Sequence, residues 1–247
     1  MQSCYNINMK NIEELQKIIN ESKSIVFFGG AGVSTASGIP DFRSEDGLYN
    51  QKCKYPPEIV LSNNFFFTKT EDFYDFYKAK FNLLKAKPNI VHKYLVKLEK
   101  CGKLKAIITQ NVDGLHTKAG NKNVYEIHGT IYKNHCLKCK KEYDAKYVFN
   151  SKGIPTCECG GIIKPDVVLY GESLKDDDVT NSIDAIKTCD TLIICGTSLN
   201  VYPATGFIKY FKGKNLVIIN KQPTKYDNKA SLIIQDDMKE VFNNLTI

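Results

Sequence analysis

The sequence predicts an α/β fold in which a doubly wound parallel sheet carries a smaller inserted lobe. Short apolar runs, typical of strands buried on both faces, recur along the chain and alternate with segments of helical periodicity. Four cysteines with metal-ligand spacing interrupt this alternation and predict the insert. A chain of 247 residues is long enough for one domain of this kind.

The chain opens with a predicted helix and a predicted buried strand. Asn11 is a candidate N-cap, and apolar residues follow it at helical spacing: Ile12, Leu15, Ile18 and Ile19. The continuous apolar run from Ile25 to Phe28 then predicts the first strand. Ordinary core packing accounts for both elements.

A glycine-rich turn follows this strand directly. Gly29, Gly30 and Gly32 permit a tight turn and the close approach of a ligand. A helix beginning near Val33 would direct free N–H groups at a phosphate. The pattern is half of a dinucleotide-binding fingerprint, because Thr35 stands where the full pattern has glycine. The glycines alone therefore leave nucleotide binding and a plain tight turn as equal alternatives.

The next part of the chain predicts a helical module. Residues 44–57 are polar and loop-like, and aromatic residues at helical spacing follow between Phe65 and Tyr77. The aromatic residues predict first the core of a small lobe and only second a ligand-binding wall. Pro88 ends this module, and a helix that contains His92 packs back on the sheet, with His92 in a structural role.

Polar side chains crowd the ends of the next two strands. Residues 105–109 predict a strand, and four polar residues follow it closely: Gln110, Asn111, Asp113 and His116. Residues 124–127 predict another short strand, which leads to His128. Ligands of open parallel sheets bind beyond the carboxyl ends of the strands, so these residues predict a site, with an ordinary polar loop as the alternative. His128 is placed to act as an acid or base near neutral pH.

Two cysteine pairs separated by 17 residues predict a structural zinc site. Cys136 and Cys139 have the common two-residue gap, whereas Cys157 and Cys159 have one residue between them. Four thiolates hold a lobe together and leave no open position on the metal for chemistry. His135 is an alternative ligand in place of one thiolate.

The last part of the chain supplies further strands to the sheet. Residues 164–172 return to its frame, and three apolar runs predict strands at 191–195, 216–219 and 232–234. Residues 196–198, Gly-Thr-Ser, form a second glycine–hydroxyl turn at a strand end. Asp236 or Asp237 caps a terminal helix that turns three apolar residues inward: Val241, Phe242 and Leu245.

Composition excludes several classes of protein. Charged residues make up 25% of the chain and hydrophobic residues 43%, which excludes a disordered chain. The net charge of +7 suits an acidic ligand, although a solvated lysine-rich surface is the favoured explanation. Residues 1–10 lack a secretory pattern and no apolar run approaches the ~18 residues of a membrane span, so we expect a cytoplasmic protein. Nine cysteines then favour thiols and a metal over disulfides.

The strand ends together predict a site for an anionic, ribose-containing ligand. Strands that end at Phe28, Thr109, Cys195 and Ile219 converge on it. The sequence has no nucleophile elbow and no Ser-His-Asp pattern, and the expected metal is structural. The chemistry is therefore expected to belong to a bound cofactor that the protein positions.

Five separated blocks of the sequence resemble the sirtuins, the NAD-dependent protein-lysine deacylases. They follow the order of that family along nearly the whole chain: Ser24–Arg43, Thr109–His116, Ile127–Gly129, Gly196–Leu199 and the four-cysteine cluster. The resemblance implies one catalytic domain, 1–247, whose Rossmann-like NAD-binding lobe comprises residues 9–43, 86–131 and 165–247. The small lobe then holds a helical module, 44–85, and a zinc-ribbon module, 132–164.

The resemblance also implies a reaction. In sirtuins, the acyl oxygen of an acyl-lysine attacks the nicotinamide ribose of NAD, nicotinamide leaves, and a histidine then acts as general base on a ribose hydroxyl. The products are free lysine, nicotinamide and O-acyl-ADP-ribose. By this resemblance His128 is the general base, Asn111 and Asp113 are the other catalytic residues, and Asp113 carries a charge that can attract a developing oxocarbenium ion.

The ligand contacts implied by the resemblance fall into three sets. NAD would be bound by Gly30, Ala31, Gly32, Thr35, Phe42, Arg43, Gln110, Asn111, Val112, Asp113, Gly196, Thr197, Ser198, Asn220, Asp237 and Met238. One structural Zn²⁺ would be bound by Cys136, Cys139, Cys157 and Cys159. The acyl-lysine peptide would add as a strand in contact with Val168, Leu169, Tyr170, Gly171 and Val201. Nicotinamide is then a product and an expected inhibitor, while a monomer without nucleic-acid or membrane partners is expected.

Two departures from the family pattern bear on these expectations. One is the single residue between Cys157 and Cys159, where the family usually has two. The other concerns the branch of the family that favours succinyl or malonyl lysine, which carries Tyr-x-x-Arg. Here the residue three positions after Tyr74 is Tyr77 and not arginine. Without that arginine an acidic acyl tail has no bidentate partner, so acetyl or longer apolar acyl groups are expected.

Three other functions are weighed against deacylation. A protein mono-ADP-ribosyltransferase would have the same nucleotide site and differ only in its product. A non-catalytic NAD or ADP-ribose sensor would not need His128 and Asn111. A zinc-ribbon nucleic-acid binder would bind in a strongly salt-dependent way and would leave the glycine-rich turn unexplained.

Overall fold

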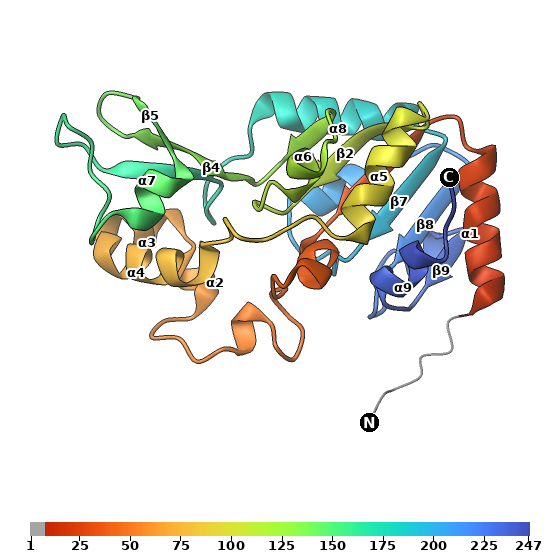
Figure 1. Ribbon diagram of the computed structural model, residues 1–247, viewed down its shortest axis with the longest axis horizontal. Helices are drawn as coiled ribbons and strands as arrows, with labels where there is room; N and C mark the ends of the chain where they lie inside the picture. Colours follow the sequence, from red (N-terminus) through yellow and green to blue (C-terminus); the bar gives the residue numbers. More distant parts are fainter. Residues whose placement is uncertain (1–7) are drawn as a thin grey trace.

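The computed structural model describes residues 8–247, which form a large and a small lobe side by side (Figure 1). A six-stranded sheet organises the large lobe and a three-stranded sheet lies in the small lobe. Residues 1–7, part of the stretch that lacks a secretory pattern, lie outside the described residues. Between residues 8 and 247, no helix has both the length and the apolar character that crossing a membrane requires.

All strands of the large sheet run parallel, in the order β3-β2-β1-β7-β8-β9. Their bounds are Ile25–Gly29 for β1, Leu104–Thr109 for β2, Val124–Glu126 for β3, Thr191–Cys195 for β7, Asn215–Ile219 for β8 and Leu232–Ile234 for β9. The chain winds outward in both directions from the β1–β7 pair, which is the switch point of a Rossmann-like sheet. The predicted doubly wound sheet is confirmed.

Helices cover both faces of this sheet (Figure 1). One face packs on α1 (Met9–Glu21), α5 (Ile90–Lys100) and α9 (Met238–Asn243). The other face packs on α8 (Asp176–Thr188) and on a 3₁₀ helix, η3 (Ala204–Tyr210). In β1, Phe27 enters the first core and Phe28 the second, because successive side chains of a strand point to opposite faces. The short helix α6 (Leu115–Ala119) follows β2.

The first helix begins earlier than predicted. The side chain of Asn8 accepts a hydrogen bond from the N–H of Lys10 at 3.1 Å, so Asn8 is the N-cap and the proposed Asn11 cap was wrong. Both asparagines precede apolar positions at helical spacing, and spacing alone does not choose between them. At the other end of the chain Asp237 caps α9, and Leu245 is buried just beyond that helix.

The small lobe combines an antiparallel sheet with four helices. The sheet has the order β5-β4-β6, with β4 at Gly129–Cys136, β5 at Glu142–Asp144 and β6 at Ile163–Val167. The helices are α2 (Pro57–Val60), α3 (Asn63–Thr68), α4 (Thr70–Phe81) and α7 (Ala145–Asn150). The predicted module boundaries after residues 131 and 164 fall inside β4 and β6, and residues 165–167 belong to the small sheet. Both boundaries fall inside strands because the chain enters the insert through β4 and leaves it through β6, and these two strands form one antiparallel pair.

The aromatic residues of α3 and α4 form the core of the small lobe. Phe73, Tyr74 and Tyr77 are at most 1% exposed and pack in one cluster with Val148 and Ile163. The first interpretation of the aromatic spacing, a core, is confirmed. This core joins the helical module to the zinc ribbon, since its members come from both.

Candidate functional site

Two turns meet backbone to backbone at the switch point of the large sheet. The N–H of Gly30 donates to the carbonyl of Cys195 at 3.0 Å, and that of Gly32 donates to the carbonyl of Gly196 at 2.9 Å. A Cβ on Gly30 would lie 2.7 Å from the Gly196 oxygen, and one on Gly32 would lie 2.7 Å from the Gly196 Cα. The glycines are therefore required first of all by the packing of one turn on the other.

The helix predicted near Val33 is a 3₁₀ helix, η1, over Ala31–Ser37. It ends at Gly38, whose φ of 81° lies in the left-handed region that favours glycine. The N–H of Gly30, just before this helix, and the N–H of Gly32, in its first turn, already donate to carbonyls of the turn after β7. Those two groups are consequently not free donors for an anion.

Three buried polar side chains form the centre of the site. Ser34 Oγ donates to Asp113 Oδ2 at 2.6 Å, and Asn111 Nδ2 donates to Ser34 Oγ at 3.1 Å. The N–H of Leu115 donates to Asp113 Oδ1 at 2.9 Å. Burial raises the pKa of Asp113, and the bonds from Ser34 and Leu115 act in the opposite direction. The arrangement holds a carboxylate, with both oxygens bonded, close to the carboxyl ends of β1 and β2.

Ser34 is not among the site residues predicted from the sequence. It lies within the glycine-rich block, but neighbouring residues were assigned to the cofactor instead. Its side chain is 1% exposed and comes from η1, while Asn111 and Asp113 follow β2. A serine among small residues in this turn was the available signal, but its partners are 77 and 79 residues away.

His128 lies between β3 and β4, with its ring beside the loop after β2. Its Nδ1 is 3.1 Å from the carbonyl oxygen of Gln110. A carbonyl only accepts, so Nδ1 carries the hydrogen and the lone pair of Nε2 remains available to take a proton. Burial lowers the pKa of His128, which the bond to Gln110 partly opposes. The ring is therefore neutral at neutral pH, as a general base must be.

The loops after β2 and β7 are joined by side chains as well. Gln110 Nε2 donates to Thr197 Oγ1 at 3.1 Å, and the N–H of Leu199 donates to the same oxygen at 3.2 Å. Arg43 Nη1 donates to Ser198 Oγ at 3.4 Å. Predicted cofactor residues from three separate blocks thus lie against one another at one edge of the sheet.

Other predicted cofactor residues have different partners. Thr35 Oγ1 donates to the carbonyl of Gly32 inside its own turn. Asn220 Nδ2 donates to the carbonyl of Gln222 at 2.7 Å, and Asp237 pairs with Lys221 at 2.8 Å. These contacts are local to the ends of β8 and β9, so the structure does not join Asn220 and Asp237 to the buried centre, and their NAD contacts stay predictions.

The segment predicted to hold the peptide lies next to His128. The N–H of Val168 donates to the His128 carbonyl at 2.9 Å. The N–H of Tyr170 donates to the carbonyl of Leu61 at 2.8 Å, and its carbonyl accepts from the N–H of Asn63 at 2.9 Å. Because both main-chain groups of Tyr170 are engaged, an added peptide strand would pair through the neighbours of Tyr170.

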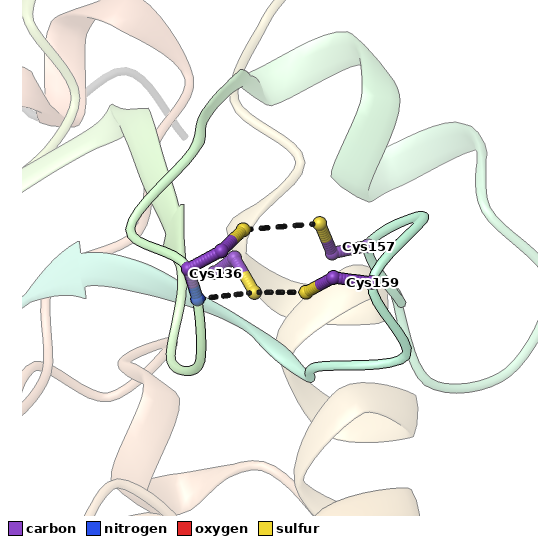
Figure 2. A group of neighbouring side chains, drawn as sticks. Cys136, Cys157 and Cys159 are labelled. Atoms are coloured by element: carbon purple, nitrogen blue, oxygen red, sulfur yellow. Dashed lines mark hydrogen bonds between the residues drawn. The ribbon is translucent and has the colours of Figure 1, made fainter.

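The four predicted zinc ligands come together in the small lobe. Their sulfur atoms all lie within 4.8 Å of one another. Cys136 Sγ is 3.4 Å from Cys159 Sγ, and Cys139 Sγ is 3.5 Å from Cys157 Sγ. Figure 2 shows Cys157 and Cys159 on one loop, facing Cys136 across the cluster. These separations fit a tetrahedral set of thiolates around one zinc ion, for which bonds of about 2.3 Å are typical.

The alternative zinc ligand and the short cysteine gap are both resolved by this geometry. His135 Nδ1 pairs with Asp166 Oδ1, and His135 does not belong to the cluster among residues 8–247. Both Cys157 and Cys159 reach the cluster despite the single residue between them. The geometry therefore favours four thiolates over three thiolates and one imidazole.

The sequence profile of the Sir2 family matches residues 30–203. The chain belongs to the Sir2 family. An "NAD-dependent protein deacetylase" of Clostridium acetobutylicum is 57% identical over 241 residues, which cover 96% of this chain and 98% of that relative. A protein of the same name from Clostridium perfringens is 55% identical, over 95% of this chain and 98% of the relative. The family predicted from the five sequence blocks is confirmed.

Solved structures of Sir2 proteins share the fold. A Sir2 complex with a p53 peptide and NAD⁺ has a TM-score of 0.84 and 38% identity, covering 94% of this chain and 95% of that one. A complex with a deacetylated p53 peptide and 3′-O-acetyl ADP ribose has a TM-score of 0.87 and 37% identity, covering 94% and 96%. A Sir2 protein bound to a propionylated peptide has a TM-score of 0.83 and 37% identity, covering 94% and 95%.

Proposed function

We propose that this chain removes acyl groups from lysine side chains and transfers them to the ADP-ribose part of NAD, with release of nicotinamide and O-acyl-ADP-ribose. The enzyme class, an NAD-dependent protein deacetylase of the Sir2 family, is confirmed by relatives up to 57% identical over nearly their full length. The observation that carries the proposed mechanism is the buried Ser34–Asn111–Asp113 centre, together with the bond between the His128 ring and the carbonyl of Gln110, the residue before Asn111. No equivalent support exists for mono-ADP-ribosyl transfer.

The residues present fit NAD at the switch point of the sheet. Dinucleotides bind at this position in doubly wound folds, and the two glycine turns bring backbone from β1 and β7 together here. When bound, NAD supplies the reactive carbon of its nicotinamide ribose. Asn111 offers an amide beside Ser34, and Gln110 and Thr197 offer hydrogen-bonding groups suited to ribose or phosphate.

His128 holds the role of general base in this proposal. The Gln110 carbonyl fixes the tautomer, so that Nε2 has the free lone pair. Burial keeps the imidazole neutral by lowering the pKa of His128. With NAD bound, Nε2 would accept a proton from a ribose hydroxyl. The bond from the N–H of Val168 to the His128 carbonyl holds the predicted peptide-binding segment close by.

With NAD bound, Asp113 would supply fixed negative charge to the site of the reaction. Its two oxygens are oriented by Ser34 and by the N–H of Leu115, so the carboxylate need not reorganise during the reaction. A buried charge acts strongly on positive charge that develops nearby, because little water screens it. We propose that this is how Asp113 favours the departure of nicotinamide.

The acyl group accepted by the site is expected to be apolar. Tyr77, at the position where an acid-selective site would need arginine, is 1% exposed and packed in the small-lobe core. Tyr74 donates its hydroxyl hydrogen to the carbonyl of Ile163. Neither residue offers a cation to a carboxylate. The structure of a relative with a propionylated peptide supports acceptance of a short apolar chain.

Zinc has a structural role in this proposal. Cys136, Cys139, Cys157 and Cys159 would hold one ion and join β4 to the loop before β6. A closed set of four thiolates leaves no open coordination position, so the ion would supply folding energy to the small lobe. No step of the reaction is assigned to it.

Three further parts of the proposal concern partners and location. Acyl-lysine peptides are the expected substrates, in keeping with relatives solved with acetylated and propionylated peptides. Nicotinamide inhibition follows from its release at the same site. A cytoplasmic location and a monomeric state stay predictions.

Mass spectrometry of an acetyl-lysine peptide tests the function. We expect NAD-dependent loss of the acetyl group together with formation of O-acetyl-ADP-ribose. An intact peptide in the presence of bound NAD, with ADP-ribose attached to protein instead, would favour the transferase alternative. A matched panel of acetyl, propionyl and succinyl peptides tests the acyl preference. Equal rates for succinyl-lysine and acetyl-lysine would contradict the argument from Tyr77.

A further inference from the structure

Tyr49 contacts two residues that are predicted to bind NAD, Phe42 and Arg43. It belongs to the short 3₁₀ helix η2 (Leu48–Asn50), and its N–H donates to the carbonyl of Phe42 at 3.0 Å. Its ring meets the ring of Phe42 edge to face, with centroids 5.4 Å apart. The guanidinium carbon of Arg43 lies 5.4 Å from the centre of the same ring. The position of the Tyr49 ring is thus tied to the cofactor side of the site.

The hydroxyl of Tyr49 reaches the peptide side of the site. It lies 2.9 Å from the hydroxyl of Tyr170, and the two residues are 121 positions apart in the sequence. Tyr170 is 42% exposed and lies in the segment expected to border the peptide. Burial raises the pKa of Tyr49, so its hydroxyl keeps its hydrogen and can donate or accept in this pair.

The segment that carries Tyr170 is itself firmly placed. Glu172 accepts hydrogen bonds from the N–H of Leu169 at 2.9 Å and from Asn63 Nδ2 at 2.8 Å. Lys164, whose side chain is 10% exposed, pairs with Glu172 at 3.1 Å. This network fixes the main chain on either side of Tyr170. The position of the Tyr170 hydroxyl is therefore tied to the position of the peptide segment.

We propose that Tyr49 is a positioning residue that couples the cofactor side of the site to the peptide side through its hydrogen bond to Tyr170. The inference rests on the proposed function, in which both ligands bind at once. A ligand that holds Phe42 and Arg43 in place also holds the Tyr49 ring, and the hydroxyl pair then holds Tyr170. Each ligand lowers the cost of ordering the other ligand's contacts, which gives a reciprocal gain in affinity.

Binding measurements without turnover test this coupling. ADP-ribose is the probe, because it lacks nicotinamide and cannot react with an acetyl-lysine peptide. Its Kd is measured by calorimetry with and without saturating acetyl-lysine peptide, for the wild type, Tyr49→Phe, Tyr170→Phe and the double variant. Tyr147→Phe is the matched control. Tyr147, like Tyr170, is exposed, and its hydroxyl donates one hydrogen bond within the small lobe, to the carbonyl of Thr156 at 2.9 Å.

We expect the peptide to tighten ADP-ribose binding in the wild type and in Tyr147→Phe by the same factor. In Tyr49→Phe and Tyr170→Phe this factor should fall about three- to tenfold, as the loss of one hydrogen bond predicts, with a Tm lowered no further than in Tyr147→Phe. The double variant should lose no more than either single variant, because both remove the same bond. Wild-type coupling in Tyr49→Phe, additive losses, or no coupling in the wild type would overturn the inference while leaving the deacetylase intact. A wild type that does not bind ADP-ribose would instead overturn the proposed function, and the inference with it.

Discussion

Replacing Ser34 with alanine tests whether the buried centre orients Asp113. Ser34 Oγ is 2.6 Å from Asp113 Oδ2 and accepts from Asn111 at 3.1 Å, and its side chain is 1% exposed. This position is closed to solvent, so no water takes the place of the lost hydroxyl. Asp113 therefore loses a hydrogen-bond donor while it stays buried. The change raises the pKa of Asp113 further, because burial is then opposed only by the N–H of Leu115.

The size of the effect follows from the charge on Asp113. A hydrogen bond to a charged group contributes about 1.5–3 kcal/mol. If Asp113 is needed as an oriented carboxylate in the transition state, kcat/KM for the acetyl-lysine peptide should fall about 10- to 150-fold in Ser34→Ala. The assay is the initial rate of NAD-dependent deacetylation at pH 7.5, measured beside the Tm.

Ser22→Ala supplies the matched control for this prediction. Ser22 is 4% exposed, donates to the carbonyl of Ile18 at 2.6 Å and lies 2.7 Å from Thr191 Oγ1. The Ser22→Ala variant therefore loses two hydrogen bonds as well, but to neutral partners: the carbonyl of Ile18 in α1 and the hydroxyl of Thr191 at the amino end of β7. Ser22→Ala should lower the Tm and keep the wild-type kcat/KM. A Ser34→Ala variant that is destabilised like Ser22→Ala, yet within about threefold of wild-type activity, would refute the role assigned to Asp113.

Three further outcomes follow from the same contacts. His128→Ala should keep its affinity for ADP-ribose within about threefold in calorimetry but lose at least ~100-fold in deacetylation, because it removes a base and not a ligand contact; near-normal turnover would contradict this assignment. Cys136→Ala should lose bound zinc and lower the Tm, whereas Cys101→Ala, an exposed cysteine outside the cluster, should do neither; a zinc-free variant with wild-type melting would count against a structural ion. Burial lowers the pKa of His92 to about 4, against about 6.5 in the unfolded chain. Above pH 6.5 the ring is neutral in both states, and as the pH falls toward 4 only the unfolded chain takes up the proton, so up to about 3 kcal/mol of stability should be lost. Urea unfolding between pH 7 and 4.5 measures this loss, and an equally steep loss in His92→Asn would show that another group is responsible.

Much of the fold followed from local patterns. The run from Ile25 to Phe28 is a strand buried on both faces, as its continuous apolar character predicted. The ends of the elements were predicted less accurately than the elements themselves. The N-cap of the first helix is Asn8 and not Asn11 because of a hydrogen bond that the spacing of apolar residues does not reveal. The predicted division after residue 164 falls inside β6, a strand whose extent depends on its long-range pairing with β4.

The candidate site was predicted by its chemistry more than by its contacts. His128, Asn111 and Asp113 were identified by residue type and by their place after predicted strands, and the structure brings them to one edge of the sheet. Ser34 was missed, since nothing in its own neighbourhood shows that its hydroxyl meets Asp113. Gly30 and Gly32 also pack their backbone on the β7 turn, a contact that the sequence did not predict, and their NAD contacts stay predictions.

The sequence by itself determined the family, the parallel sheet and the cysteine set, because each depends on residue type and short-range spacing. Only the tertiary structure decided which side chains touch. It joined Ser34 to Asp113 across 79 residues, excluded His135 from the cysteine cluster and placed the Tyr49 hydroxyl against Tyr170. The physical reason is that hydrogen bonds act over about 3 Å, and only the packing of strands and loops brings distant parts of a chain that close.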